Sequence, residues 1–418
     1  MADLNASKTK VTFWLLALAL VFIYVRPYEL IPILEKLKVA KIALLAALFF
    51  SFIESYKRGV VLKERGFRLL FYLQLLAVVL MPFAIWTGKA MDFWLESYVK
   101  IFALFYLIVV ALEDGRKVDT VLRLIFVCCA LVAGRVVLAF LTGNIIYDYD
   151  GTRRVMGISI LSSTDPNDMA LAIAMSLPIG MYFFYTVKGL LAKSFYLGLA
   201  LICIAAILYS GSRGGYLGLL TGATVFFFMV YRTKKLRLAG FALLGLMALP
   251  FVPGDYQARF TSIFDSENYV YSEAGRLGIW KRGLSTVIRE PQGVGISNFA
   301  LTEGERKKEK GYQGKWHVAH NSYLQVAVEL GVAGFILYSL FLYTGFKELG
   351  RIIRMSDEAG DARRRFCATA LTASLVAFCI SSFFLSQAYY WNHYIFIGVI
   401  IALKNVMTAE KTAREAIA

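Results

Sequence analysis

The sequence predicts an all-α polytopic membrane protein with about twelve transmembrane helices. Hydrophobic residues make up 58% of the 418 residues and charged residues only 18%, below the roughly 25% that is usual in soluble domains. Apolar runs of about 17 to 25 residues recur along the whole chain, long enough to cross a bilayer core of about 30 Å. Polar and apolar residues do not alternate within these runs, so helices are expected rather than the strands of a barrel.

Reading each apolar run against its charged or Gly/Pro ends gives the expected spans. They are 11–25, 39–53, 67–87, 98–112, 121–141, 167–187, 194–210, 214–231, 237–253, 320–346, 366–385 and 390–403. An even number of spans places both termini on one side of the membrane. Lys and Arg gather on that side, at 57–68, 232–237 and 351–365, so the positive-inside rule makes it cytoplasmic. The first run lacks a small-residue cleavage site and is expected to stay as a helix.

The spans divide the chain into three parts: 1–253 with spans one to nine, an outer loop at 254–319, and 320–418 with the last three spans and a cytoplasmic tail. Within the loop, 276–290 predicts a short amphipathic helix. Its apolar stripe contains Leu277, Trp280 and Leu284, and Arg282 lies on the opposite side. The polar run at 303–315 is expected to be a mobile excursion.

Composition also argues against two other classes of protein. The net charge of +16 does not indicate nucleic-acid binding, because the basic residues lie at the ends of apolar runs and not on one soluble domain. Disulfides outside the membrane are not expected, because every cysteine lies within an apolar run. The cysteines are Cys128, Cys129, Cys203, Cys367 and Cys379.

The first candidate for chemistry is the hairpin around Arg213, in Ser210-Gly211-Ser212-Arg213-Gly214. Its glycines would let the backbone approach a ligand. The free N–H groups that open the next helix would add positive partial charge beside the guanidinium, which suits a pyrophosphate. The alternative is that the glycines serve the turn and that Arg213 reaches lipid phosphate.

The second candidate is His320, where the outer loop re-enters the membrane. A helix opening favours neutral imidazole, which is what a general base needs. His317 and His320 also raise the possibility of a metal site, but His393 is expected on another loop. Zinc usually takes three or four ligands, so no metal is expected and His317 is assigned a structural role.

Arginines form the third set, because a guanidinium group grips phosphate oxygens in bidentate fashion. Arg259, Arg276 and Arg282 lie in the outer loop, where they could equally anchor lipid head groups. Arg135 is expected inside its span and needs a partner or a polar cavity. Arg153, Arg154 and the segment 165–168 could line the same outer vestibule. Glu329 is placed on the helix face opposite His320, so it is not expected to orient that imidazole.

Three segments together resemble the O-antigen ligase superfamily, which contains lipopolysaccharide O-antigen ligases, O-antigen polymerases and bacterial O-oligosaccharyltransferases. They are Ser210-Gly211-Ser212-Arg213-Gly214; Gly275-Arg276-Leu277-Gly278-Ile279-Trp280, continuing to Pro291-Gln292-Gly293-Val294-Gly295; and His320-Asn321-Ser322-Tyr323-Leu324 with Glu329-Leu330-Gly331. Their order, across a long outer loop of a twelve-span chain, carries the resemblance.

The resemblance implies a metal-independent, cofactor-free, inverting glycosyltransferase of GT-C-like architecture in the bacterial inner membrane. Its donor would be an undecaprenyl-diphosphate-linked glycan at the periplasmic face, and its acceptor lipid A-core or another hydroxyl. By resemblance, Arg213 and Arg276 contact the diphosphate and His320 takes the acceptor proton. Arg259 is matched to a second loop arginine of the family, and Arg282 is a further candidate for binding phosphate.

Three functions stay open at this stage. The chain is expected to be an O-antigen ligase; the alternatives within the superfamily are an O-antigen polymerase and a protein O-oligosaccharyltransferase. A transporter or flippase without covalent chemistry would place buried charges around a midplane cavity. In this sequence the conspicuous polar groups collect at the outer surface instead, which argues against transport.

Overall fold

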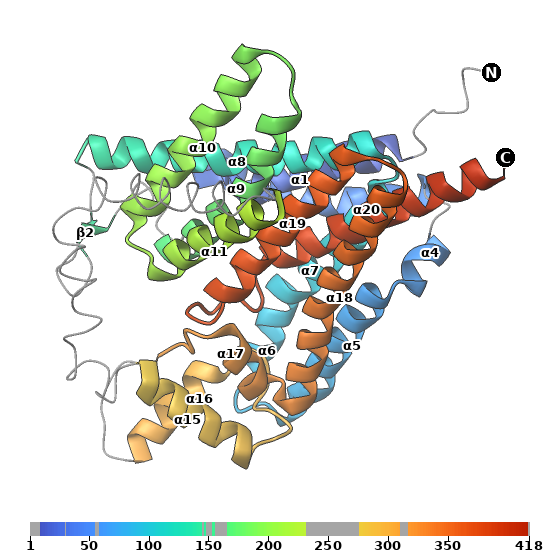
Figure 1. Cartoon of the computed structure of the whole chain (residues 1–418). Helices are drawn as coiled ribbons and strands as arrows, with labels where there is room; N and C mark the ends of the chain where they lie inside the picture. The colour runs from blue at the N-terminus through green and yellow to red at the C-terminus, as the bar shows by residue number, and fades with distance from the viewer. Residues whose placement is uncertain are drawn as a thin grey trace.

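The computed structural model describes residues 9–29, 31–54, 58–143, 146–147, 153–154, 165–230, 276–309 and 317–416. Within these ranges the protein is a helical membrane protein, and nine helices are long and apolar enough to cross a membrane (Figure 1). A single antiparallel strand pair is described, β1 (Ile146–Tyr147) with β2 (Arg153–Arg154). The predicted fold class is therefore confirmed.

The helices of the first half are α1 (Lys10–Tyr24), α2 (Pro32–Lys36), α3 (Val39–Glu54), α4 (Arg58–Lys63), α5 (Arg65–Leu80), α6 (Thr87–Phe93), α7 (Val99–Ala111), α8 (Gly115–Leu141), α9 (Pro166–Thr186), α10 (Leu190–Ser210) and α11 (Arg213–Val230). Short turns η1 (Pro27–Glu29), η2 (Met81–Phe83) and η3 (Trp94–Tyr98) join some of them. The second half contains α15 (Arg276–Arg289), α16 (Phe299–Glu309), α17 (Ser322–Glu329), α18 (Gly331–Glu358), α19 (Ala362–Ser381) and α20 (Trp391–Glu415).

Every predicted span except the ninth and the tenth overlaps one of these helices, and the ninth, 237–253, lies outside the described residues. Two helices at predicted spans are not among these nine: α1 has 15 residues and α3 has 16, which at 1.5 Å per residue is less than the roughly 30 Å of a bilayer core. The even count of twelve spans stays a prediction.

Two predictions about the second half were wrong. The span at 320–346 is not one helix, because the chain breaks between α17 and α18 at Gly331, whose φ is +69°. The polar run after residue 303 is not an excursion over its whole length, because α16 extends to Glu309. The first N–H group of α16, at Phe299, donates to the Glu329 carboxylate at 3.1 Å. This tertiary contact satisfies a donor at the start of the helix, which the polar sequence of α16 does not predict.

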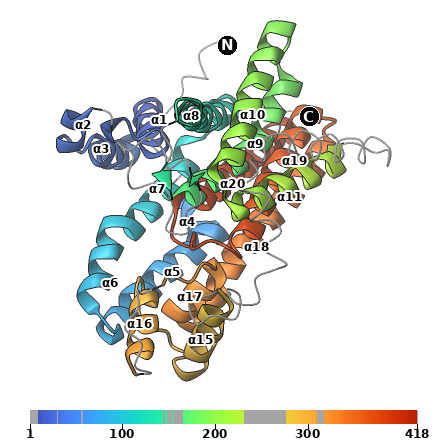
Figure 2. The ribbon, with the colours of Figure 1, turned by 90° about the vertical axis from the view of Figure 1, so that its left-hand side faces the viewer.

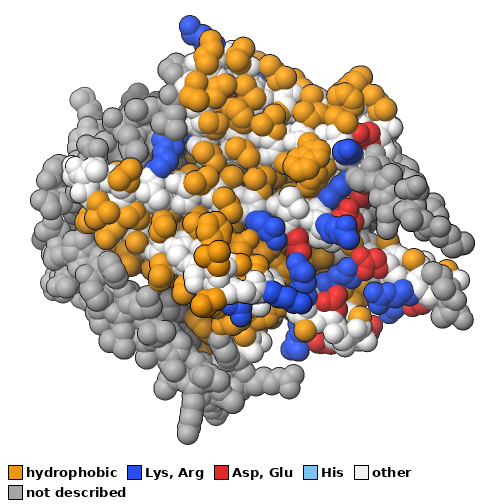
Figure 3. Space-filling model, turned by 90° about the horizontal axis from the view of Figure 1, so that it is seen from above, with side chains coloured by type: hydrophobic (Ala, Val, Ile, Leu, Met, Phe, Trp, Pro, Cys, Tyr) orange, Lys and Arg blue, Asp and Glu red, His pale blue; other side chains and the backbone are white. Residues whose placement is uncertain are grey.

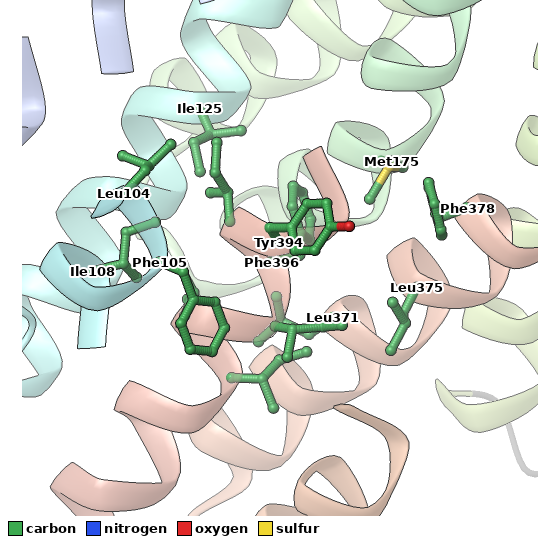
Figure 4. Close-up of a cluster of buried hydrophobic side chains, with 14 of the residues drawn as sticks. Leu104, Phe105, Ile108, Ile125, Met175, Leu371, Leu375, Phe378, Tyr394 and Phe396 are labelled. Carbon is green, nitrogen blue, oxygen red and sulfur yellow. The ribbon is translucent and has the colours of Figure 1, made fainter. Parts of the chain in front are cut away.

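The core lies around α9 and α20. In the apolar stretch of each of these helices 72% of the residues are buried inside the protein, compared with 28% for α10 and α11. Figure 4 shows this centre, where buried side chains of α20 such as Tyr394 and Phe396 lie in one cluster with Phe105 of α7 and Leu371 of α19. The inner helices are apolar on all sides, as expected for helices surrounded by other helices. The outer helices present apolar side chains to lipid, and Figure 3 shows this broad hydrophobic surface.

One end of the bundle, here called the ion-paired end, carries salt bridges between helices. Arg363 pairs with Asp119 at 2.6 Å, Arg364 with Glu410 at 2.6 Å, and Lys404 with Glu64 at 2.8 Å. Figure 3 likewise shows basic and acidic side chains gathered on one side of the hydrophobic surface. From this end α19 runs about 30 Å to the opposite end of the bundle. Residues 382–390 join α19 to α20 there and are called the connector.

Candidate functional site

The hairpin between α10 and α11 lies at the predicted place. Gly211 ends α10 with a φ of +63°, a conformation that glycine adopts without steric cost. The Ser212 hydroxyl then accepts a hydrogen bond from the Gly215 N–H at 3.1 Å, as an N-cap side chain does. Arg213 is the first residue of α11, and its side chain is exposed. The turn therefore presents this guanidinium at the surface of the bundle.

The glycines after Arg213 serve helix packing and do not open the backbone to a ligand. A Cβ atom at Gly215 would lie 2.5 Å from the Cβ of Ala170 in α9, and one at Gly214 would lie 3.0 Å from Leu385 of the connector. Ser381, at the end of α19, fills the space beside Gly218. The expected close approach of a ligand to the backbone is thus not favoured at Gly214 and Gly215, whereas Gly211 serves the turn, and the exposed side chain of Arg213 stays a candidate for ligand contact.

His320 directly precedes α17, as predicted. Its backbone has a φ of +45°, which is uncommon for a residue with a side chain. Its N–H donates to the Ser386 hydroxyl of the connector at 2.9 Å. The next residue, Asn321, caps the helix by accepting from the Leu324 N–H at 2.9 Å. These contacts hold the His320 backbone at the positive end of α17, and its imidazole is half-buried there.

The end of α19 and the connector that follows it contact both the hairpin and the segment that begins at His320. Ser381 donates its hydroxyl to the Gly214 carbonyl at 2.7 Å, immediately after Arg213. Ser322 donates its hydroxyl to the Leu385 carbonyl at 2.6 Å and accepts from the Gln387 N–H at 2.8 Å. Two segments far apart in the sequence, each with a predicted site residue, therefore rest on the same short stretch of chain.

Helix α15 confirms the predicted amphipathic helix and packs on α17 and the connector. The Trp280 indole N–H donates to the Ala319 carbonyl at 3.0 Å, and the Trp280 ring lies 6.4 Å from that of Phe384. Both views show α15, α16 and α17 gathered at one end of the molecule (Figure 2). Arg276 is the first residue of α15 and is half-buried. It therefore belongs to the same end of the bundle as His320.

Part of the apolar stripe of α15 faces away from the protein, although Trp280 packs inward. Leu277, Leu284 and Ile288 are 48%, 58% and 81% exposed, whereas Ile279 and the small Gly283 pack inward. An exposed apolar stripe on a short helix with arginines is typical of a helix that lies in the membrane interface. The predicted contact of this helix with lipid is thus compatible with its packing.

Arg282, a predicted phosphate-binding residue, forms an ion pair inside the protein. Its guanidinium lies 2.6 Å from the Glu303 carboxylate of α16, and the Glu303 side chain is only 2% exposed. The same carboxylate accepts from the His317 N–H at 3.3 Å. The pair joins α15 to α16, and the contact at His317 agrees with the structural role expected of that residue.

Substituting Arg282 by methionine is expected to destabilise the protein by about 3–5 kcal/mol, because Glu303 would stay buried without its partner. Thermal unfolding of the purified protein measures this loss. The double variant Arg282→Met, Glu303→Gln is expected to recover most of it, since no buried charge is then left. Arg289→Met, at the exposed end of the same helix, is the matched control. Equal stability of wild type and Arg282→Met would contradict a structural pair.

The turn at 291–295 lies directly on the break between α17 and α18. The Val294 N–H donates to the Val328 carbonyl at 3.0 Å, and the Gly295 N–H to the Glu329 carbonyl at 2.9 Å. The Val332 N–H in turn donates to the Pro291 carbonyl at 2.9 Å. Two of the sequence segments that carry the family resemblance thus pack against each other backbone to backbone.

Glu329 supports this turn and does not reach toward His320, which lies at the other end of α17. Its Oε1 accepts from Phe299, and its Oε2 is buried with no hydrogen-bond partner among the described residues. Burial raises the pKa of the Glu329 carboxyl to about 7, although the hydrogen bonds that it accepts oppose the rise. The carboxyl therefore changes charge near neutral pH at the base of α16.

The remaining predicted residues fall elsewhere. Arg259 lies outside the described residues. His393 is not on a loop as predicted; it is the third residue of α20, fully buried, with its ring 4.1 Å from that of Phe378. Among the described residues no cluster of three or more His, Cys, Asp or Glu side chains could hold a metal ion.

The connector itself was missed by sequence reasoning. The sequence feature that could have indicated the connector is the polar pair Ser386-Gln387 between the last two apolar runs. The predicted span 366–385, however, included most of the first half of the connector. Only the fold shows that Ser386 contacts His320 and that Gln387 contacts Ser322.

Fold and site together define a polytopic membrane protein with a polar site at one end of its helix bundle, assembled from two helix starts and a connector. Residues 198–339 match the family model described as O-Antigen ligase, so the resemblance to the O-antigen ligase superfamily is confirmed. The match covers about a third of the chain and includes Arg213, Arg276 and His320 but not the connector. Members of this family are membrane glycosyltransferase-like enzymes. No curated protein matches the chain.

Proposed function

We propose that the protein is an O-antigen ligase, which transfers a glycan from undecaprenyl diphosphate to a hydroxyl of lipid A-core at the periplasmic face. The observation that carries the proposal is that the end of α19 and the connector contact both the Arg213 hairpin and His320, with both residues inside the family-matched segment. A guanidinium for phosphate and an imidazole for a hydroxyl proton are the two groups that such a transfer requires.

In this proposal Arg213 and Arg276 bind the diphosphate. Each is the first residue of a helix, where the partial positive charge of the helix start adds to the guanidinium. As the bond between the anomeric carbon and the diphosphate oxygen breaks, these fixed charges offset the negative charge on the departing oxygen. Arg259 is kept as a further diphosphate contact, whereas Arg282 is assigned to its ion pair with Glu303.

His320 takes the proton of the acceptor hydroxyl as that oxygen attacks the anomeric carbon from the side opposite the diphosphate. The new bond forms as the old one breaks, so the anomeric configuration inverts. All groups named in this step belong to the chain or to its two substrates, so the mechanism needs neither a metal ion nor an organic cofactor.

The proposed location is the bacterial inner membrane, with both termini in the cytoplasm. Support comes from the ion-paired end, where Glu64 and Arg364 of two basic segments both pair with α20; basic segments favour the cytoplasmic side. The site lies at the opposite end and would face the periplasm. The three-part division at residues 253 and 319 follows from this topology.

A reconstitution with several acceptors tests the function. Purified protein receives undecaprenyl-diphosphate-linked glycan together with lipid A-core, a second lipid-linked repeat unit and a serine-containing peptide in parallel. Glycan attached to lipid A-core is the expected product. Extension of the lipid-linked chain would instead identify a polymerase, and modified peptide a protein O-oligosaccharyltransferase. Movement of lipid-linked glycan across vesicles without any new covalent product would replace the proposal by a flippase.

Arg213→Ala is expected to lower the transfer rate by about 10²–10³-fold, because one charge that stabilises the departing diphosphate is lost. The rate is measured in the same reconstitution at saturating acceptor. Arg213→Lys should retain part of the activity, since it keeps the charge but not the bidentate geometry. Arg289→Ala, an exposed arginine at the far end of α15, should behave as wild type. An unchanged rate in Arg213→Ala would remove this residue from the mechanism.

A further inference from the structure

A second charged feature lies in a cavity of about 500 Å³ that the proposed chemistry does not use. The cavity is bounded by the last turn of α1, the segment through η1 to α3, η3, and parts of α8, α9 and α20. Five basic and two acidic side chains line it: Arg26, Lys38, Lys41, Lys100, Arg135, Glu96 and Asp168. Positive charge therefore prevails in a space that lies within a membrane protein.

Arg135 is the side chain that makes this cavity unusual. It belongs to α8, one of the helices long enough to cross the membrane, and both terminal nitrogens of its guanidinium are buried without a hydrogen-bond partner among the described residues. A buried charge without a partner is costly in protein and in lipid. The sequence predicted that Arg135 needs a partner or a polar cavity, and the Arg135 side chain lines this cavity with its two terminal nitrogens just beneath the accessible surface.

Neither acid of the cavity lining neutralises this guanidinium. Glu96 pairs with Lys100 at 2.7 Å, and Asp168 accepts a hydrogen bond from the Gln387 side chain of the connector. No ion pair between either carboxylate and Arg135 is formed in the described part of the chain. An anion from outside the protein would complete the site.

The rest of the cavity wall is apolar, with Phe22, Leu34, Val132, Met169 and Ile173 among its residues. A small inorganic anion would leave these side chains facing empty or water-filled space. A ligand that combines an anionic group with a hydrocarbon chain would satisfy both parts of the wall. Lipids with a phosphate group have this combination.

We propose that the cavity binds the phosphate group of a membrane lipid, with the Arg135 guanidinium paired to the phosphate oxygens and the lipid chain against the apolar wall. Guanidinium and phosphate match in bidentate geometry. The phosphate could belong to a phospholipid or to a polyprenyl phosphate, and the experiment below separates these sources. The site is distinct from Arg213, and it touches the connector through Asp168, Gln387 and Tyr390.

The test uses delipidated full-length protein titrated with phosphatidylglycerol, a polyprenyl monophosphate or diacylglycerol, which has chains but no phosphate. Binding is followed by native mass spectrometry. Arg135→Gln is expected to weaken binding of a phosphate lipid by about 10-fold or more, the effect of losing a charge-assisted hydrogen bond. Arg123→Gln is the matched control, because Arg123 is an exposed arginine of the same helix that contacts the Phe183 ring. It should bind as wild type does.

The lipid preference and the thermal stability give further readouts. Tighter binding of the polyprenyl monophosphate would identify a substrate-like lipid, and tighter binding of phosphatidylglycerol a structural phospholipid; either supports the proposal. Without lipid, Arg135→Gln should unfold at a higher temperature than wild type, because a buried unpaired charge is gone. If this variant does not fold, Lys41→Gln, at the exposed rim, should bind phosphate lipids about twofold more weakly. Equal binding of diacylglycerol, or wild-type affinity in Arg135→Gln, would overturn the proposal.

Discussion

Replacing His320 by alanine is expected to lower the rate of glycan transfer by about 10²–10⁴-fold, the usual contribution of a positioned general base. The backbone of this residue is held by Ser386 and its neighbour caps α17, and both contacts persist in an alanine variant. The protein should therefore remain folded while the acceptor hydroxyl loses its proton acceptor. Transfer to lipid A-core by purified protein, at saturating donor and acceptor, is the measurement.

His317→Ala is the matched control for this prediction. It removes an imidazole three residues away, next to the Arg282–Glu303 pair, and should leave the rate close to that of wild type. Strong loss in both variants would point to damage of the segment before α17 and not to a proton transfer. Full activity in His320→Ala would exclude this imidazole as the base.

Gly331→Val is expected to destabilise the protein by about 2–6 kcal/mol, combining a strained backbone with overpacking. The φ of +69° is unfavourable for a β-branched residue. A Cβ atom at this position would also overlap the backbone of Pro291 and Gln292. Backbone atoms cannot move aside as a flexible side chain can, so the turn at 291–295 would have to leave α17. Thermal unfolding in detergent measures the loss of stability.

Gly350→Ala provides the comparison within the same helix. No atom lies within 4 Å of a Cβ placed there, and alanine is favoured over glycine in a helix interior by about 1 kcal/mol. This variant should be as stable as wild type or slightly more so. A Gly331→Val protein with wild-type stability would show that the break between α17 and α18 tolerates a side chain, and the contact with the 291–295 turn would lose its structural importance.

Hydropathy predicted most of the membrane-spanning helices because each crossing of the lipid bilayer needs a long apolar run. Hydropathy predicts less about segments that do not cross the bilayer and about breaks within an apolar run. Gly331 falls inside an apolar run, so nothing in the hydropathy marks the break that its positive φ allows. Helix α16 has a polar sequence, and its start depends on Glu329, which lies 30 positions further along the chain.

The candidate site likewise has a part that the sequence predicted and a part that only the fold shows. Arg213 and His320 were predicted as site residues from short polar segments next to membrane spans, and Arg276 as an arginine of the outer loop. What the sequence did not reveal is their support, because hydrogen bonds such as those of Ser322 and Ser386 join segments that only the fold brings together. Arg135 is the intermediate case. Its need for a partner could be predicted from its place in a span, but the cavity around it could not.

The position of the connector has a consequence for how variants of this protein are interpreted. Residues 382–390 lie beyond the family-matched segment 198–339, yet Ser386 accepts from the His320 N–H and Leu385 packs against Gly214, next to Arg213. A mutated or truncated chain could keep every signature by which the family is detected and still lose the alignment of its two halves. The presence of the sequence motifs in a variant is therefore weaker evidence of an intact site than the presence of α19, α20 and the connector between them.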